Sequence, residues 1–255
     1  MEIEIVTLSK QGGRAYNEDV YGHWNDDRHV ICVVADGAGG HGGGDVAAAV
    51  VRQSVLSGFA ENPGLDAGLL RAVIERANLQ VVARQAEGGK LSAMRSTVVL
   101  AAIDLVEHKI ALAHSGDSRA YLFHEGALVA RTVDHSLVQQ MVAGGMIDEE
   151  GARLHPQRNM LLSALGSVDP VPDIVVSPAM PLQAGDVLLL CSDGIWEPLG
   201  DECLYRTLQA SRTASQWVEE IDAQVKANAK PGYDNYTALS LWAHDDDDEV
   251  TQLIP

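Results

Sequence analysis

The chain has 255 residues, of which 36 are acidic and 18 are basic, so its formal net charge is −18. This charge excludes nucleic acid and anionic membranes as main partners, because both select basic protein faces. Hydrophobic residues make up 46% of the chain but aromatic residues only 5%, which predicts a sizeable core of aliphatic side chains. The excess of carboxylates leaves two interpretations open: a solvated, repulsive surface or, in part, a cation site.

No segment indicates export or membrane insertion. Residues 1–10 lack the basic and apolar regions of a secretory signal, and no apolar run approaches the ~20 residues that span a bilayer. The number of cysteines is odd and none shows CxxC spacing, so no disulfide framework is expected among Cys32, Cys191 and Cys203. We therefore expect a cytoplasmic protein that acts as a monomer.

Short apolar runs between polar turns predict seven strands, at Ile3–Leu8, Val30–Ala35, Thr97–Ile103, Ile110–His114, Arg119–Phe123, Val187–Cys191 and Thr237–Trp242. Helical spacing of apolar residues predicts helices within residues 45–59, 65–85, 134–152 and 201–229. We expect Asp134 to cap the third of these, and Thr213 with Gln216 to form a capping box in the last.

Strands and helices come in groups along the chain and do not alternate, which predicts one α+β domain with antiparallel sheets covered by helices. No Pro/Gly/Ser-rich linker divides it. We expect this domain to span residues 1–243. Residues 244–255 contain five consecutive acids, Asp245–Glu249, and we expect them to form a solvated, flexible tail.

Two apolar runs end in the same dipeptide, Asp36-Gly37 and Asp193-Gly194. In each case the run fixes the backbone, the aspartate projects a carboxylate from the sheet's end, and the glycine permits a sharp turn. Two such strands side by side would bring the carboxylates together. Like charges that close either share a proton or bind cations.

Further acids lie at strand margins. Glu18 and Asp19 precede an alternating segment, Asp234 opens the last strand, and Asp117 lies between two strands as a hairpin turn would. Each acid alone is explained by turn chemistry. Together, with buried runs on one side of each, they favour a site built of oxygen ligands, which selects Mg²⁺ or Mn²⁺ over Zn²⁺. Arg14, just upstream of Glu18, could bind a phosphate through its guanidinium fork.

The ordered set of motifs resembles the metal-dependent protein phosphatases of the protein phosphatase 2C type, in their bacterial single-domain form. The resemblance extends from about residue 5 to 242 and rests on Arg14-x-x-Asn17-Glu18-Asp19, Ala35-Asp36-Gly37-Ala38-Gly39-Gly40-His41, Ser96-Thr97, Gly116-Asp117-Ser118-Arg119, Asp134-His135-Ser136, Ala164-Leu165-Gly166, Cys191-Ser192-Asp193-Gly194 and Asp234-Asn235-x-Thr237.

The resemblance implies an αββα sandwich, two antiparallel sheets flanked by helices, with a binuclear Mn²⁺ or Mg²⁺ centre at one end. It implies hydrolysis of phosphoserine and phosphothreonine in phosphoproteins, by in-line attack of a metal-activated water, which would reverse a Ser/Thr kinase. Asp36 would bridge the two metals and Gly37 would offer its carbonyl. Arg14 would bind the substrate phosphate.

The resemblance assigns the remaining acids as well. Asp193 and Asp234 would ligate the first metal, and Glu18 would ligate the second. Asp19 would contribute through water, and Asp117 would match the ligand of a third, weaker metal. Residues from about 141 to 162 would form a mobile flap beside the site.

The general acid is left open. Ala38 occupies a position where some relatives of this type have a histidine proposed as the acid, so none can be assigned there. His41 is the nearest alternative, and protonation by a metal-bound water is another.

Two other functions remain as alternatives. A catalytically idle adaptor of the same fold would bind phosphoproteins or a kinase, although such proteins usually lose ligands that this chain keeps. A phosphatase dedicated to a sigma-factor regulator commonly carries sensory domains, for which 255 residues leave no room. By analogy, the partners would be a membrane-linked Ser/Thr kinase and a forkhead-associated substrate.

Overall fold

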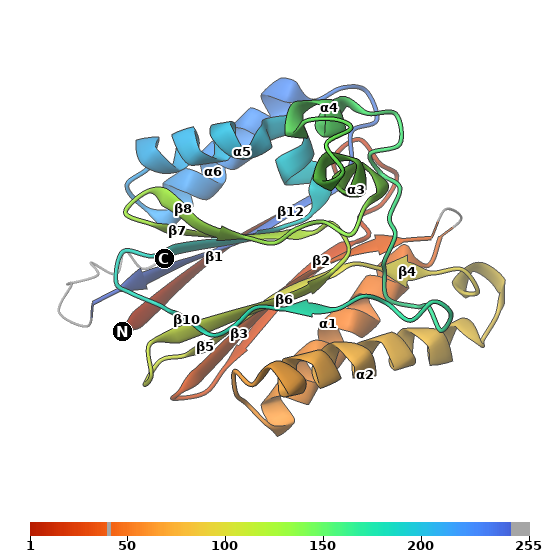
Figure 1. Ribbon diagram of the computed structural model, residues 1–255, viewed down its shortest axis with the longest axis horizontal. Coiled ribbons are helices and arrows are strands. Elements are labelled where there is room, and N and C mark those ends of the chain that lie inside the picture. Colours follow the sequence, from red (N-terminus) through yellow and green to blue (C-terminus); the bar gives the residue numbers. More distant parts are fainter. Residues whose placement is uncertain (40–41, 246–255) are drawn as a thin grey trace.

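The computed structural model describes residues 1–39 and 42–245, which form two antiparallel sheets packed face to face with helices outside (Figure 1). Along the first sheet the strands follow the order β1 (Glu2–Lys10), β12 (Tyr236–His244), β11 (Val187–Cys191), β7 (Arg119–His124) and β8 (Ala127–Arg131). The N-terminal strand therefore pairs with the last strand of the chain.

The second sheet is built mostly from the first half of the chain. Its main path runs β10 (Met180–Pro181), β6 (Lys109–Ser115), β5 (Val98–Asp104), β3 (His29–Ala38) and β2 (Asp19–Asn25). Two short strands lie off this path: β4 (Arg95–Ser96) pairs with β3, and β9 (Val175–Val176) pairs with β6.

Helices cover both outer faces, as Figure 1 shows. The second sheet carries α1 (Gly44–Glu61) and α2 (Ala67–Gln85), and the first carries α5 (Asp193–Ala210) and α6 (Ala214–Asn228). The short helices α3 (Leu137–Ala143) and α4 (Glu149–Leu154) lie near one end of the sandwich, and a 3₁₀ turn spans Gly89–Leu91. The arrangement confirms the expected αββα sandwich.

Alternation along β3 explains how one strand serves two apolar layers. Ile31, Val33 and Ala35 belong to the cluster beneath α1 and α2, whereas Cys32 and Val34 belong to the cluster between the sheets. Successive side chains of a strand point to opposite faces, so a continuous apolar run is needed when both faces are buried. A third cluster packs α5 and α6 onto the first sheet.

The layer between the sheets changes from apolar to polar at one end. On β3, Cys32 and Val34 face the layer between the sheets, and Asp36 is the next residue on the same face of the strand. On β12, Leu241 and Leu239 face the same layer, and Thr237 is the next residue on that face toward the same end. The sandwich therefore ends in polar groups at the place where the functional site is built.

All seven predicted strands are confirmed, but two longer strands were not predicted. Strand β2 was read only as an alternating segment. Strand β8 lies at the edge of the first sheet, where its residues are half-buried or exposed. The region predicted to be helical at 134–152 contains α3 and α4, and the last helical region begins earlier than expected, at Asp193.

The predicted cap at Asp134 is wrong. Ser136 caps α3 by accepting a hydrogen bond from the Gln139 N–H, whereas both Asp134 oxygens bind Arg119. The cap at Thr213 is confirmed, since its Oγ1 accepts from the Gln216 N–H at 3.2 Å.

Two expectations about connections are also wrong. The turn holding Asp117 is no hairpin, because β6 and β7 belong to different sheets and residues 116–118 cross between them. The strands preceding Asp36 and Asp193 are not neighbours in one sheet either. They face each other across the sandwich, through Val34 and Leu190 of the shared apolar layer.

The three cysteines are free thiols, with Cys32 and Cys191 buried. Within the described ranges, no helix is both long enough and apolar enough to cross a membrane.

Truncation of the layer between the sheets should destabilise the whole fold. Leu190 is fully buried, so Leu190→Ala is expected to lower the free energy of unfolding by about 2–5 kcal/mol in urea titrations. Leu128, 45% exposed on edge strand β8, provides the matched control, and Leu128→Ala should change stability little. A loss below about 1 kcal/mol for Leu190→Ala would contradict the role given to this layer.

Candidate metal centre

Asp36 and Asp19 lie opposite each other on the neighbouring strands β3 and β2. The Asp36 N–H donates to Thr97 Oγ1 at 3.0 Å, and the Thr97 N–H donates back to the Asp36 carbonyl at 2.8 Å. Asp19 is buried, and its Oδ2 accepts from Ser192 Oγ at 2.6 Å. Backbone pairing therefore fixes two carboxylates side by side, and Ser192 links them to the opposite sheet.

Glu18 and Gly37 meet the first residue of α1. The Gly37 N–H donates to the Glu18 carbonyl at 3.2 Å. A Cβ at Gly37 would lie 2.1 Å from the Gly44 carbonyl oxygen, and a Cβ at Gly44 would lie 2.3 Å from Glu18 Oε1. Glycine is required at both positions because backbone and carboxylate approach too closely for any side chain.

Asp193 is the first residue of α5, separated from the end of β11 only by Ser192. The Ser192 N–H donates to the Thr237 carbonyl at 3.0 Å, which ties the helix start to β12. A Cβ at Gly194 would lie 1.9 Å from the Asn235 carbonyl oxygen, so the glycine allows close contact between the helix and the loop before β12.

Asp234 forms an ion pair with Arg14, with 2.5 Å between Nη2 and Oδ2. The neighbouring Asn235 secures the loop that carries Arg14. Its Nδ2 donates to the carbonyls of Gln11 and Tyr16, and its Oδ1 accepts from the Glu18 N–H at 2.9 Å. Asn235 thus holds three predicted site residues, Arg14, Glu18 and Asp234, in one arrangement.

Asp117 is buried in the link between the sheets. Its carbonyl accepts a hydrogen bond from Trp196 Nε1 at 2.9 Å. Helix α5 therefore holds both Asp193, which it carries, and the link that contains Asp117. Burial raises the pKa of Asp117 to about 7, and the nearby Asp134 charge adds to the shift.

Electrostatics show that the predicted acids gather at one place. Burial raises the pKa of Asp36 well above its usual value, and the charges of Asp19, Asp193, Asp117 and Asp234 raise it further. Burial likewise raises the pKa of Asp193, with added repulsion from Asp117, Asp234 and Asp19. Burial raises the pKa of Asp19 to about 6, although the Ser192 hydrogen bond opposes the shift.

Glu18 joins the same cluster from the side of α1. Burial raises its pKa, as does the charge of Asp45 in the first turn of that helix, and Asp234 adds a smaller repulsion. Each of the six carboxylates picked from the sequence therefore lies close enough to at least one other to repel it: Glu18, Asp19, Asp36, Asp117, Asp193 and Asp234.

Three buried oxygens of this cluster fit a cation. Glu18 Oε1, Asp19 Oδ1 and Asp193 Oδ1 have no hydrogen-bond partner within the described part of the chain. An unsatisfied buried carboxylate oxygen is costly, and a hard divalent cation prefers such ligands. Nevertheless, across residues 1–39 and 42–245 no three acid, histidine or cysteine side chains are already close enough to hold an ion.

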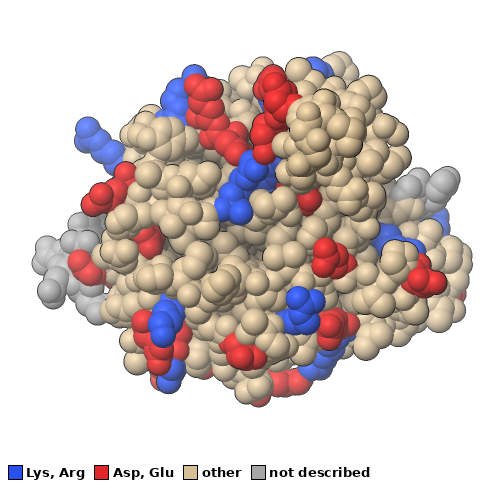
Figure 2. Space-filling view, in the orientation of Figure 1, with Lys and Arg blue, Asp and Glu red and all other residues tan. Residues whose placement is uncertain are grey.

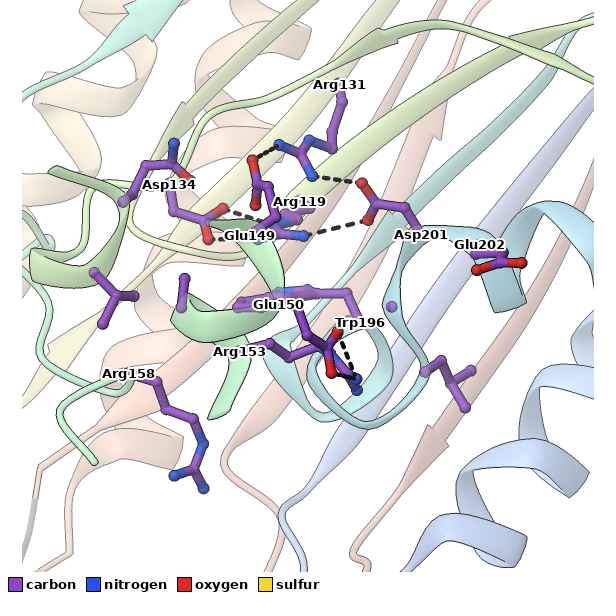
Figure 3. Close-up of a pocket in the computed structure, with 15 residues that line it drawn as sticks. Arg119, Arg131, Asp134, Glu149, Glu150, Arg153, Arg158, Trp196, Asp201 and Glu202 are labelled. Carbon is purple, nitrogen blue, oxygen red and sulfur yellow. Dashed lines mark hydrogen bonds and ion pairs between the residues drawn. The ribbon is translucent and has the colours of Figure 1, made fainter. Parts of the chain in front are cut away.

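A charged pocket adjoins the cluster, beneath α3 and α4 (Figure 3). At its base Arg119 is nearly buried, forms two hydrogen bonds of 2.8 Å with Asp134, and stacks 3.5 Å above the Trp196 ring. Arg131 bridges Asp201 and Glu149 in the same view. Two ion pairs join the segment predicted as a flap to the rest of the fold, Arg131–Glu149 and Arg158–Glu197.

Over the face drawn in Figure 2, acidic and basic side chains are interspersed on a surface that is mostly uncharged. The carboxylates of the cluster are not simply part of a uniform acidic surface, because they are brought together by the fold.

Sequence reasoning missed three residues that position the site: Ser192, Asn235 and Trp196. Asn235 and Ser192 stood inside quoted motifs, and the signal was an amide or hydroxyl directly beside a predicted ligand. Trp196 follows Asp193 by three residues, one helical turn on, but only the fold directs its indole to Asp117. His41, the alternative general acid, lies outside the described residues.

Comparison with known proteins identifies the class. Residues 9–233 match the family described as Protein phosphatase 2C. The serine/threonine phosphatase stp of Listeria monocytogenes is 36% identical over 233 residues, which cover 89% of this chain and 90% of the relative. The serine/threonine protein phosphatase PstP of Mycobacterium tuberculosis is 34% identical over 94% of this chain, but only 45% of PstP is covered.

Solved structures agree. Stp1 of Staphylococcus aureus superposes with a TM-score of 0.84 at 28% identity, covering 96% of both chains. The catalytic domain of PstP in complex with two manganese ions gives 0.77 at 29% identity, covering 95% of this chain and 99% of that domain. PppA of Pseudomonas aeruginosa, described as a key regulatory component of T6SS, gives 0.75 at 27%, covering 95% and 98%.

Fold, site and relatives together define a serine/threonine protein phosphatase. The chain belongs to the protein phosphatase 2C family, and its matched relatives are bacterial enzymes of this type. Because these relatives are named as phosphatases, they favour an enzyme over a catalytically idle adaptor.

The raised carboxylate pKa values make metal-free stability depend on pH. Asp19 and Asp117 have folded pKa values of about 6 and 7, against about 3.9 in an unfolded chain. Between about pH 4 and pH 7 the folded state therefore binds more protons, so its free energy of unfolding falls as the pH rises through this window.

In EDTA, the melting temperature should consequently rise as the pH is lowered from about 7.5 to about 5.5. Saturating Mn²⁺ at the higher pH should raise it as well, because the ion binds only the folded state. Scanning calorimetry checks both trends. Equal melting temperatures in EDTA and Mn²⁺ would contradict the assignment of the cluster.

Proposed function

We propose that this phosphatase hydrolyses phosphoserine and phosphothreonine in phosphoproteins at a binuclear Mn²⁺ or Mg²⁺ centre held by the carboxylate cluster. The observation that carries the proposal is a set of buried oxygens on Glu18, Asp19 and Asp193, near Asp36, that have no hydrogen-bond partner among the described residues. The manganese complex of PstP, a structural relative, supports the choice of ion.

Asp36 would bridge the two cations, with Asp193 and Asp234 on the first and Glu18 on the second. Asp19 would act through water, and Gly37 would add its carbonyl. Asp117, farther along the link between the sheets, would hold a third and weaker ion. When bound, such cations lower the pKa of a water molecule and neutralise phosphoryl oxygens for in-line attack.

Arg14 would bind and orient the substrate phosphate. Its side chain is 51% exposed and faces Asp234, whose charge holds the guanidinium at the centre. Once that carboxylate is neutralised, the guanidinium can exchange it for a phosphate, which it binds through two parallel hydrogen bonds. Two donors are open for the proton of the departing hydroxyl: His41, which lies outside the described residues, and a water at the centre.

Removal of the central ligand should abolish turnover. Asp36→Asn is expected to lower Mn²⁺-dependent hydrolysis of a phosphothreonine peptide by at least about a hundredfold, since even the loss of a residue that only hydrogen-bonds to a metal ligand costs up to that much. EDTA should abolish the wild-type activity, and Mn²⁺ should restore it. Asp27→Asn, at an exposed aspartate outside the cluster, serves as the control. Activity retained by Asp36→Asn, or unaffected by EDTA, would overturn the metal mechanism.

We further propose that the enzyme works in the cytoplasm and reverses a Ser/Thr kinase, with a forkhead-associated protein among its substrates. The free thiols suit a reducing compartment. The description of PppA as a regulatory component of a secretion system supports a signalling role of this kind.

Deletion of the gene should therefore increase phosphothreonine and phosphoserine on a limited set of proteins, measured by quantitative phosphoproteomics. Complementation with wild type, but not with Asp36→Asn, should reverse the increase. An unchanged phosphoproteome would remove the kinase-reversal proposal.

A further inference from the structure

A groove of about 530 Å³ leads away from Arg14. One wall is the end of α4 and the segment after it, the second is the first turn of α5, and the third is the link from α6 to β12. Its lining holds four basic residues, Arg14, Arg153, Arg158 and Lys230, against two acidic ones, Glu197 and Asp234. The chain as a whole has the opposite balance, with 18 basic and 36 acidic residues.

Three of these four bases are already paired. Arg153 binds Glu150 at 2.9 Å, as Figure 3 shows, Arg158 binds Glu197, and Arg14 binds Asp234. Lys230 is exposed, and within residues 1–39 and 42–245 its ammonium group has no ion-pair or hydrogen-bond partner. Lys230 is therefore the uncompensated charge of the groove.

Lys230 stands on a rigid turn. The Tyr233 N–H donates to the Lys230 carbonyl at 3.0 Å, and Gly232 has a φ of +75°. A proline followed by a glycine of positive φ is the preferred sequence for the middle of a type II turn, and Pro231-Gly232 provides it. The backbone that carries the lysine is thus held by the turn, whereas its side chain remains free to contact a ligand.

The same turn is packed against the loop that carries Arg14. The Gly13 N–H donates to the Tyr233 carbonyl at 2.9 Å, and a Cβ at Gly13 would lie 2.9 Å from Gly232 Cα. The backbones that carry Arg14 and Lys230 are therefore in direct contact, which fixes the position of one relative to the other. A ligand held by its phosphate at Arg14 would extend into a groove where the next available cation is Lys230.

The geometry points to Lys230 as a residue that determines substrate specificity, by pairing with an acidic side chain near the phosphorylated residue of a protein substrate. This inference rests on the proposed function, because it requires a phosphopeptide with its phosphate at Arg14. Apolar surface from Leu154, Pro198 and Pro231 lines the groove and can contact the intervening peptide.

The test compares two phosphothreonine peptides that differ only in their flanks, one with glutamates and one with glutamines at the same positions. With Mn²⁺-loaded wild type, the acidic peptide should have a KM about two- to fivefold lower at equal kcat, the size of an exposed charge pair. Lys230→Gln should remove this difference, and Lys230→Glu should reverse it in favour of a lysine-flanked peptide. High salt should weaken the preference.

Lys226→Gln provides the matched control. It removes the same charge from α6, four residues away, at a lysine that pairs with Asp222 and does not line the groove. This variant should keep the preference for the acidic peptide. Turnover of p-nitrophenyl phosphate, which has no peptide flanks, should be unchanged in all lysine variants and reports that they are folded.

Three results would overturn the inference: equal KM values for both peptides with wild type, an undiminished preference in Lys230→Gln, or loss of the preference in Lys226→Gln as well as Lys230→Gln. Failure of the proposed function has a different signature. In that case the wild type would hydrolyse neither phosphopeptide, or would hydrolyse them equally well in EDTA.

Discussion

Repulsion among carboxylates that reach one end of the sandwich from both sheets is the constraint on which the site depends. The apolar layer between the sheets continues along β3 to Val34 and is replaced by Asp36 two residues later. Because the layer is closely packed, the strands cannot move apart to relieve the repulsion. The raised pKa values of Asp36 and Asp193 express the same conflict, which protons or cations can resolve.

Neutral groups hold this charged cluster in place. Ser192 joins Asp19 to the start of α5, Thr97 fixes the backbone of Asp36, and Asn235 secures the loop around Glu18. A neutral hydrogen bond can fix a backbone without cancelling the charge that a cation requires. Arg14 is the exception, since its ion pair with Asp234 places a phosphate-binding group at the rim of the cluster.

The distribution of basic residues complements that of the acids. Arg119 is buried beneath α3 and α4, where its guanidinium binds the Asp134 carboxylate and stacks on the Trp196 ring. Arg153 and Arg158 are paired on the wall of the groove beside the site. Lys230 differs because its turn exposes the ammonium group with no partner in the described structure. An acidic protein can therefore still present one cation to an acidic substrate next to its phosphate-binding residue.

The sequence by itself determined seven of the strands, most of the helices and the identity of the clustered acids. Continuous apolar runs such as Val30–Ala35 are local signals, and an acid directly after such a run is a local signal too. The resemblance to a phosphatase family rested on these same short motifs. The cap at Ser136 was missed because the Asp134 carboxylate binds Arg119, a residue that only the fold brings to it.

Only the tertiary structure decided how these pieces meet. It placed the strands before Asp36 and Asp193 in opposite sheets, and it made the Asp117 turn a crossing between them. It also brought Arg14 to Asp234, 220 residues away, and set the Lys230 turn against the Arg14 loop. Local patterns specify which face of a strand is buried, whereas pairing across such separations depends on how the whole core packs.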